Sequence, residues 1–383
     1  MFVFPAHLVA TPVLERAGGE RPGVVLGAGA TAAWVDLDGF VVAITTREVP
    51  LLPNAVALAA GSGALARAGV GPGAPARLSL GRVDLGPLRV TWDPAAPPAW
   101  DPTVLVPRDA DRDSVARRGG ALLGALGIGF DPAAPDPTAP HPPGPDPPVD
   151  SRARAAFRWS ATLPHRGTRQ RRVGLPAAPG TRQPGAAWSA ALVDELARIG
   201  LPTAVDSDGA AALRLLFQGV RERDPVPAAA AARELLGRGP GLTPEGDDLL
   251  AAVAGTLAVL GPATGLHGND LAALLTAIGV KDSKRAGPPT PATGRTTALS
   301  ETLLALAAAG RLPEPAGRLL DLGPNGEAAW PAALARLERL GHGSGRAYAA
   351  GIAVATGLLP PGISAGSGAP GEDRQHHRRG RVP

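Results

Sequence analysis

The spacing of hydrophobic and polar residues changes its period along this chain. In the first hundred residues, short β-rich runs are separated by Gly and Pro turns. The runs 32–37 and 40–45 are joined by Asp38-Gly39, the strongest short signal for a β-hairpin. Further strands are expected at 24–26, 76–80 and 88–92. This pattern predicts a small antiparallel barrel or sandwich.

Beyond residue 110, apolar positions recur at the helical period of three to four residues. The predicted helices span 111–126, 186–199, 208–222, 227–236, 244–260, 270–278, 297–309, 328–340 and 345–358. Because strands and helices occupy separate parts of the chain, the expected class is α+β. We expect a small N-terminal antiparallel β domain, followed by an α-helical C-terminal domain.

The domain boundaries follow from shifts in composition. Nine of the twenty residues in 131–150 are proline, which removes backbone donors and favours an extended or disordered chain. The predicted units are a β-rich domain at 1–105, a helical connector at 106–130, a disordered Pro/Arg-rich linker at 131–185, a helical domain at 186–359, and a disordered basic tail at 360–383.

The net charge of +4 is unevenly distributed over the 383 residues. Segment 151–182 contains eight arginines and no acidic residue, and the tail 371–383 adds a net +2, so the rest of the chain is mildly acidic at about −6. A basic arm can bind nucleic acid through phosphate contacts or can simply be solvated. Since no nucleic-acid-binding module accompanies it, nucleic acid is not the expected partner.

Several classes of protein are excluded by what the chain lacks. The absence of Cys excludes disulfides, thiolate nucleophiles and thiolate zinc sites, and is typical of a reducing compartment. Neither Lys281 nor Lys284 follows a Gly-rich phosphate loop, so there is no Walker A motif. The start of the chain does not resemble a secretory signal, and the apolar windows 249–269 and 347–371 are too short and interrupted to span a membrane. We expect a cytoplasmic protein in which these windows are buried helices.

The most informative motif is GRGPGLTPEGDD at 237–248, which runs directly into the apolar helix LLAAVAGTLAVL. Thr243 is expected as the N-cap and Pro244 as the first helical residue. A Gly-rich loop that leads into a helix N-terminus presents unpaired N–H groups at the positive end of the helix dipole, which favours an anion. The alternative, a well-capped helix after a tight turn, is equally consistent with the loop alone.

The two aspartates of the motif favour a functional site. By helical spacing Asp247 is in line with Leu250 and Val253, on the stripe that should face the core, and Asp248 lies about 100° around the helix. Stabilisation by the helix dipole explains an acid in the first turn, but it does not explain a carboxylate on the core side. The pair can therefore flank one pocket.

Two later segments also lead into a helix through polar, Gly-containing sequence. They are TGRTTALSE at 293–301, with Thr296 or Thr297 as cap, and GHGSGR at 341–346, with Ser344 as cap. If the three helix starts converge, they gather carboxylates, hydroxyls, Arg295 and His342 around one site. A histidine between glycines at a helix entrance is as consistent with a structural role as with a catalytic one.

At these three segments the sequence resembles the bacterial AllH family, the small subunit of oxamate carbamoyltransferase and its relatives. That family has GLGPGLTPSGDD where this chain has GRGPGLTPEGDD, and the blocks RTTALSETLLALAAAGRLPEP and GHGSGRAYAAGIAVA resemble its other two blocks in the same order. The N-terminal hairpin WVDLDGFVVAI also fits. The resemblance covers about 1–105 and 190–358, and Arg238, Glu245 and Gly343 depart from the family pattern.

This resemblance implies carbamoyl transfer, in which oxalurate and phosphate exchange with oxamate and carbamoyl phosphate, in a hetero-oligomer with two larger subunits. The implied setting is allantoin and purine degradation in nitrogen metabolism. A carbamoyl group carries two N–H donors, so the Asp pair can accept hydrogen bonds from substrate while anionic oxygens bind at the helix starts. Alternatively, Mg²⁺ neutralises the acids, although no metal ligand is assigned.

The expected catalytic residues are Asp247, Asp248 and His342. The expected substrate-binding residues are Gly239, Gly241, Thr243, Gly246, Arg295, Thr296, Thr297, Ser300, Ser344 and Gly345. A second hypothesis is a non-catalytic subunit that binds a small anion or a partner protein and contributes no chemical groups.

Overall fold

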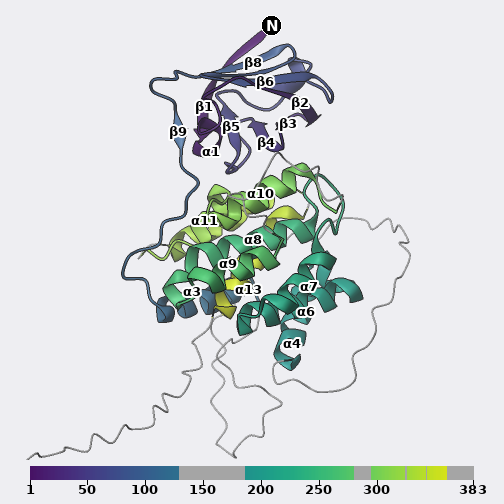
Figure 1. Cartoon of the computed structure of the whole chain (residues 1–383), viewed down its shortest axis with the longest axis vertical. Coiled ribbons are helices and arrows are strands. Elements are labelled where there is room, and N and C mark those ends of the chain that lie inside the picture. Colours follow the sequence, from purple (N-terminus) through teal and green to yellow (C-terminus); the bar gives the residue numbers. More distant parts are fainter. Residues whose placement is uncertain (129–185, 280–294, 324–325, 342, 360–383) are drawn as a thin grey trace, which may run out of the picture.

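The computed structural model describes residues 1–128, 186–279, 295–323, 326–341 and 343–359. The predicted linker and tail, the residue His342 and the segment 280–294 lie outside this part of the chain. The described chain forms a β-barrel at one end and a helical region at the other, as Figure 1 shows. The α+β prediction is confirmed.

Eight strands close the barrel in the order β5-β4-β3-β2-β6-β7-β8-β1, and β1 returns to pair with β5. Their bounds are β1 (Phe2–Ala10), β2 (Arg21–Ala28), β3 (Ala32–Leu37), β4 (Phe40–Thr45), β5 (Ala55–Leu58), β6 (Pro75–Ser79), β7 (Arg82–Leu85) and β8 (Leu88–Thr91). The barrel is mostly antiparallel, but β1 runs parallel to β8, and β4 runs parallel to β5. Two short helices, α1 (Thr11–Leu14) and α2 (Ala64–Arg67), lie in its connections.

The hairpin β3–β4 forms as its sequence predicts. Asp38 and Gly39 both have positive φ, 57° and 81°, which matches the twist of a two-residue hairpin. The Asp36 carboxylate accepts a hydrogen bond of 2.8 Å from the Gly39 N–H. In β3 every second residue is buried, because one face points into the barrel.

A short strand, β9 (Ala99–Trp100), pairs with β1 and leads to α3 (Arg112–Ala125). The remaining helices are α4 (Ala186–Arg198), α5 (Pro202–Val205), α6 (Ser207–Glu222), α7 (Pro225–Leu235), α8 (Glu245–Leu260), α9 (Gly268–Ala277), α10 (Ala298–Ala308), α11 (Glu314–Leu319), α12 (Trp330–Leu337) and α13 (Ser344–Leu358). Three 3-10 turns, η1 (Pro262–Thr264), η2 (Glu327–Ala329) and η3 (Glu338–Leu340), complete the described elements.

Helices α8 and α13 form the centre of the helical core, and nearly every residue of each is buried. Their close approach depends on glycine: a Cβ on Gly351 would lie 2.7 Å from the Cβ of Ala252. On the other side of α13, a Cβ on Gly119 of α3 would lie 2.7 Å from the Cα of Gly357. The windows predicted as buried helices are therefore confirmed over their described parts. No helix in the described ranges is long and apolar enough to cross a membrane.

The barrel rests on the helical region through strand β4. Val41 packs against Leu299 and Leu303 of α10, so β4 is buried on its outer face as well as its inner one. The Val41 N–H donates a hydrogen bond of 3.0 Å to the Thr302 hydroxyl, and its carbonyl accepts one of 2.8 Å from the Asn54 side chain. These contacts place the barrel next to the start of α10 (Figure 1).

Candidate functional site

The first turn of α8 contains three buried carboxyl groups. Glu245 is 8% exposed, and Asp247 and Asp248 are each 3% exposed. The helix begins at Glu245 with Pro244 as its N-cap residue, so the expectation that Thr243 caps it was wrong by one position. The cap shifts because Pro244 adopts an extended conformation, with ψ at 143°, instead of entering the helix. The Gly246 position allows this turn to lie against α7: a Cβ there would be 2.1 Å from the Leu235 carbonyl oxygen.

Asp247 is held by one backbone and one side-chain donor. Its Oδ1 accepts a hydrogen bond of 2.7 Å from the Gly237 N–H, and its Oδ2 accepts one from the Thr296 hydroxyl. Burial raises the pKa of Asp247, while these two donors and the Ser300 hydroxyl counteract the rise. The hydrogen-bond donors thus offset only part of the cost of burying the charged form of Asp247.

Asp248 is less well satisfied than its neighbour. Its Oδ2 is buried and has no hydrogen-bond partner in the described structure. Burial raises the pKa of Asp248 well above its ordinary value, the hydroxyls of Ser344 and Thr243 oppose the shift, and the nearby Asp247 and Glu245 add to it. Burial therefore shifts Asp248 toward the neutral, protonated form relative to an ordinary aspartate.

Glu245 completes the group, which we call the carboxyl cluster (Glu245, Asp247 and Asp248). Its Oε1 accepts a hydrogen bond of 2.8 Å from the Thr203 N–H in the first turn of α5. Burial raises the pKa of Glu245, and the positive charge of Arg346 partly lowers it. Arg238, which departs from the family pattern, forms an ion pair with Asp206 at the start of α6 instead of with the cluster.

The starts of α8, α10 and α13 are joined by hydroxyl groups. Thr243 and Ser344 share a hydrogen bond of 3.0 Å between their hydroxyl oxygens, and the Thr297 hydroxyl donates one of 2.6 Å to the Leu242 carbonyl. Thr297 is the N-cap of α10, where its hydroxyl accepts from the Ser300 N–H at 3.1 Å. The expectation that Ser344 caps α13 was wrong, because Gly343 occupies the N-cap position and Ser344 begins the helix.

The Gly-rich loop 237–243 passes over this junction. Gly239 and Gly241 have φ of 114° and 103°, which only glycine adopts readily, and both are exposed. A Cβ on Gly239 would lie 2.9 Å from the Glu245 N. A Cβ added to Gly27 of β2 would contact the Leu242 side chain at 3.9 Å. The loop therefore reaches both the carboxyl cluster and the barrel.

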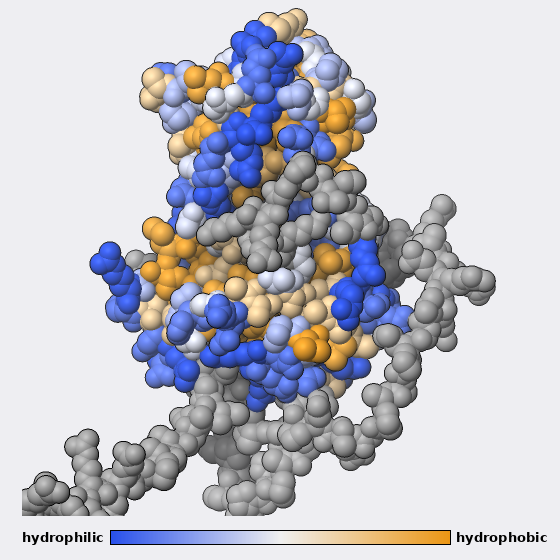
Figure 2. Space-filling model, in the orientation of Figure 1, coloured by the Kyte–Doolittle hydropathy of each residue, from blue (hydrophilic) through white to orange (hydrophobic). Residues whose placement is uncertain are grey.

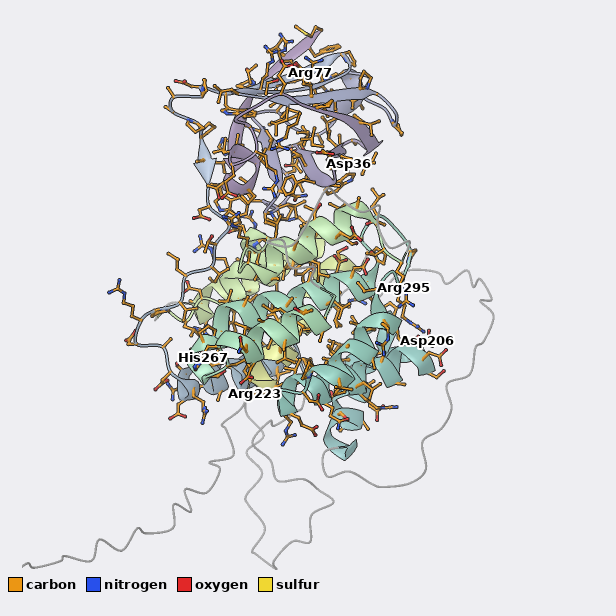
Figure 3. All side chains as sticks on the ribbon, viewed as in Figure 1. Asp36, Arg77, Asp206, Arg223, His267 and Arg295 are labelled. Atoms are coloured by element: carbon orange, nitrogen blue, oxygen red, sulfur yellow. The ribbon has the colours of Figure 1, made fainter. Side chains whose placement is uncertain are left out.

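Other predicted site residues have different surroundings. Arg295 is exposed at the edge of the helical region, where Figure 3 labels it, and its guanidinium donates to the Arg233 carbonyl at 3.3 Å. Gly345 permits close packing, since a Cβ there would be 1.8 Å from the Leu337 carbonyl oxygen. The prediction for His342 falls outside the described residues. Within the described ranges, no group of three His, Asp or Glu side chains is placed to hold a metal ion.

Sequence reasoning missed two neighbours of the cluster. Tyr348 is 2% exposed and lies one turn after Ser344 on the face of α13 that packs against α8; burial raises its pKa, and the nearby Asp248 carboxyl adds to the rise. Its spacing from Ser344 was the available signal, but Tyr348 was not among the expected site residues. Nothing in the sequence around Thr203 indicated its contact with Glu245.

Fold and site together define a two-part α+β protein, in which a closed β-barrel adjoins a helical region with a buried carboxyl cluster at its central helix. Residues 235–356 match the family model described as oxamate carbamoyltransferase subunit AllH, over about a third of the chain. This match confirms the predicted resemblance for that segment, which contains α8, α10 and α13. No curated protein and no solved structure gives a significant match.

Proposed function

We propose that this protein is an AllH-like subunit of a carbamoyltransferase-type complex, and that the carboxyl cluster orients the amide groups of the reactants. The family match over 235–356 supports the class of complex, with larger carbamoyltransferase subunits as partners. The single observation that carries the site assignment is the unpartnered, buried Oδ2 of Asp248 beside Asp247. A buried acceptor of this kind needs a donor, and carbamoyl and oxamate groups supply N–H donors.

The chemistry of the exchange fits carboxyl groups of raised pKa. In the direction of oxalurate formation, the amide nitrogen of oxamate bonds to the carbamoyl carbon, the bond from that carbon to the phosphate oxygen breaks, and phosphate leaves. The nitrogen must also lose a proton. A carboxylate whose pKa is raised by burial accepts that proton more readily than an ordinary one. We assign this role to Asp247, which has two donors to hold it, and substrate orientation to Asp248.

The remaining predicted residues enter this proposal as binding groups. The hydroxyls of Thr243, Thr296, Thr297, Ser300 and Ser344 and the loop N–H groups of Gly239 and Gly241 are donors for anionic oxygens. His342 is proposed as an acid or base. Arg295 can join them only if its side chain turns away from the Arg233 carbonyl. Because burial shifts Asp248 toward the neutral form, the site is expected to carry less negative charge than three ionised carboxylates would, which reduces the need for Mg²⁺.

A non-catalytic subunit is the second candidate function, and one observation favours it. All three carboxyl groups are more than nine-tenths buried, and two pockets of the described surface lie elsewhere. One is between α7 and α9, and the other lies between the β9 connection and α11. In this alternative the cluster is structural, and the larger subunits carry the chemistry.

The test is an activity assay on the reconstituted complex. The chain is co-expressed with the larger subunits of a carbamoyltransferase complex of this type, and phosphate-dependent cleavage of oxalurate is measured. Asp247→Asn is expected to lower kcat/KM at least about 100-fold, as removal of a general base does. Asp208→Asn, at an exposed position on α6, is the matched control and should leave activity unchanged. Full activity of Asp247→Asn, or of the larger subunits without this chain, would contradict the catalytic assignment.

A further inference from the structure

The groove between α7 and α9 is not used by the carboxyl cluster. It has a volume of about 580 Å³ and is lined by Pro225, Val226, Ala229, Arg233, Ala272, Ala273, Thr276 and Ala277. Four of these eight residues are alanine, so the groove is lined mainly by small apolar side chains. Figure 2 shows weakly hydrophobic atoms over α7 and α9, with hydrophilic atoms on either side. A surface of this kind suits close packing against another helix.

One residue at the edge of the groove projects from it. Val226 is 73% exposed, which is the largest exposure of any valine in the described part of the chain. It lies directly beside the four alanines that line the groove. A projecting apolar side chain next to a small-residue hollow is self-complementary, because the projection of one molecule fits the hollow of another.

The ends of the groove carry opposite charges. The two helices run in the same direction, since the Arg223 guanidinium, just before α7, donates to the Thr264 carbonyl, just before α9, and Leu236 lies near Gly279 at their other ends. On α7, Arg233 is in line with Val226 and Ala229 by helical spacing, near the C-terminal end.

On α9, the exposed Asp270 is in line with Ala273 and Ala277, at the N-terminal end. The groove therefore has an acid at one end and a base at the other. A second copy turned by 180° brings Arg233 of each molecule to the same end of the groove as Asp270 of the other, across the groove, and two-fold symmetry forms this ion pair twice.

We propose that the groove is a homodimer interface, in which α7 and α9 of two copies of this chain pack antiparallel. The apolar floor contributes the burial, and the Arg233–Asp270 pairs set the direction of packing. This inference is independent of the carbamoyltransferase proposal, because no residue of the groove belongs to the carboxyl cluster.

Sedimentation equilibrium of the full chain measures the dimer directly. The native protein is expected to be dimeric at micromolar concentration. Val226→Glu and Ala273→Glu should each raise the dimer dissociation constant at least about 100-fold, because two carboxylates per dimer would be buried without partners. Val205→Glu, at an equally exposed valine (69%) on α5 outside the groove, is the matched control and should leave the dimer intact.

Two further sets of variants make the test specific for direction and place. Arg233→Asp and Asp270→Arg should each weaken the dimer, and the double variant should restore it, which a loss of folding could not produce. Since the chain has no cysteine, Ala273→Cys introduces a single thiol, which should cross-link on oxidation, whereas Val205→Cys should not. A native chain that stays monomeric at about 100 µM, or a dimer unaffected by both groove variants, would overturn the proposal.

Discussion

The burial of Asp248 predicts an inverted effect on stability, in which removing the acid stabilises the protein at neutral pH. In the unfolded chain this carboxyl loses its proton near pH 4, whereas burial raises its pKa in the folded chain. Between those two values the folded state binds more protons than the unfolded state, so the free energy of unfolding falls as pH rises. Asp248→Asn removes this loss, because an amide of the same size does not ionise.

The size of the effect follows from the contacts of the carboxyl. One oxygen is buried without a partner; an unsatisfied buried group costs about 1–3 kcal/mol, and the cost is larger when the group is charged, so Asp248→Asn removes the part that is due to the charge. The hydroxyls of Thr243 and Ser344 offset part of this cost. We therefore expect Asp248→Asn to be more stable than the native chain by about 1–2 kcal/mol at pH 8, with a difference that disappears below about pH 4.

Urea unfolding at a series of pH values, followed by circular dichroism, measures this difference. Asp208→Asn removes an exposed acid from the first turn of α6 and should show no comparable dependence on pH. If Asp248→Asn were less stable than the native chain at every pH, or if its advantage did not change with pH, the reasoning from burial would be refuted.

Three other predictions follow from single contacts. Tyr348 is the only tyrosine in the chain, so labelling with 3-fluorotyrosine should yield one ¹⁹F NMR signal. The chemical shift of this signal should change with pH in the native protein, because Asp248 lies close to Tyr348. The change should be lost in Asp248→Asn. Thr302→Val should leave the buried Val41 N–H unpaired and lower the free energy of unfolding by about 1–3 kcal/mol. Thr256→Val should lower it less, because the Thr256 hydroxyl donates to a carbonyl of its own helix. Equal losses in urea unfolding would argue against the contact between the barrel and α10. Gly246→Ala should destabilise the fold through its clash with the Leu235 carbonyl, whereas Gly120→Ala, which meets nothing within 4 Å in α3, should be neutral or stabilising by about 0.5–1 kcal/mol. If the close approach of α7 and α8 were unimportant, thermal melts would show the same effect for both variants.

Local rules predicted a large part of the fold. The Asp38-Gly39 hairpin, the Thr297 cap and most helices depend on residues that are close in sequence, so short patterns were enough to find them. The caps at Thr243 and Ser344 were misplaced by one residue, because proline and glycine conformations at the neighbouring positions decided where each helix begins. Strand β1 was not predicted: it contains Pro5 and His7, and it is a strand because it pairs with β5 and β8.

In the candidate site, too, some features were set by local sequence and others by tertiary contacts. The sequence by itself determined which residues form the first turn of α8. It also indicated that the two aspartates of this turn are not explained by helix stabilisation alone. Tertiary packing decided how far these acids are buried. Helix α13 approaches α8 closely at Gly351, and this packing buries Asp248, which helical spacing had placed beside the core-facing stripe. Arg295 donates its hydrogen bond to the Arg233 carbonyl on α7. Closure of the barrel through β1 and β5 was likewise a matter of contacts between distant residues. The physical reason is that backbone conformation responds to near neighbours, whereas desolvation of a charge depends on every element that packs around it.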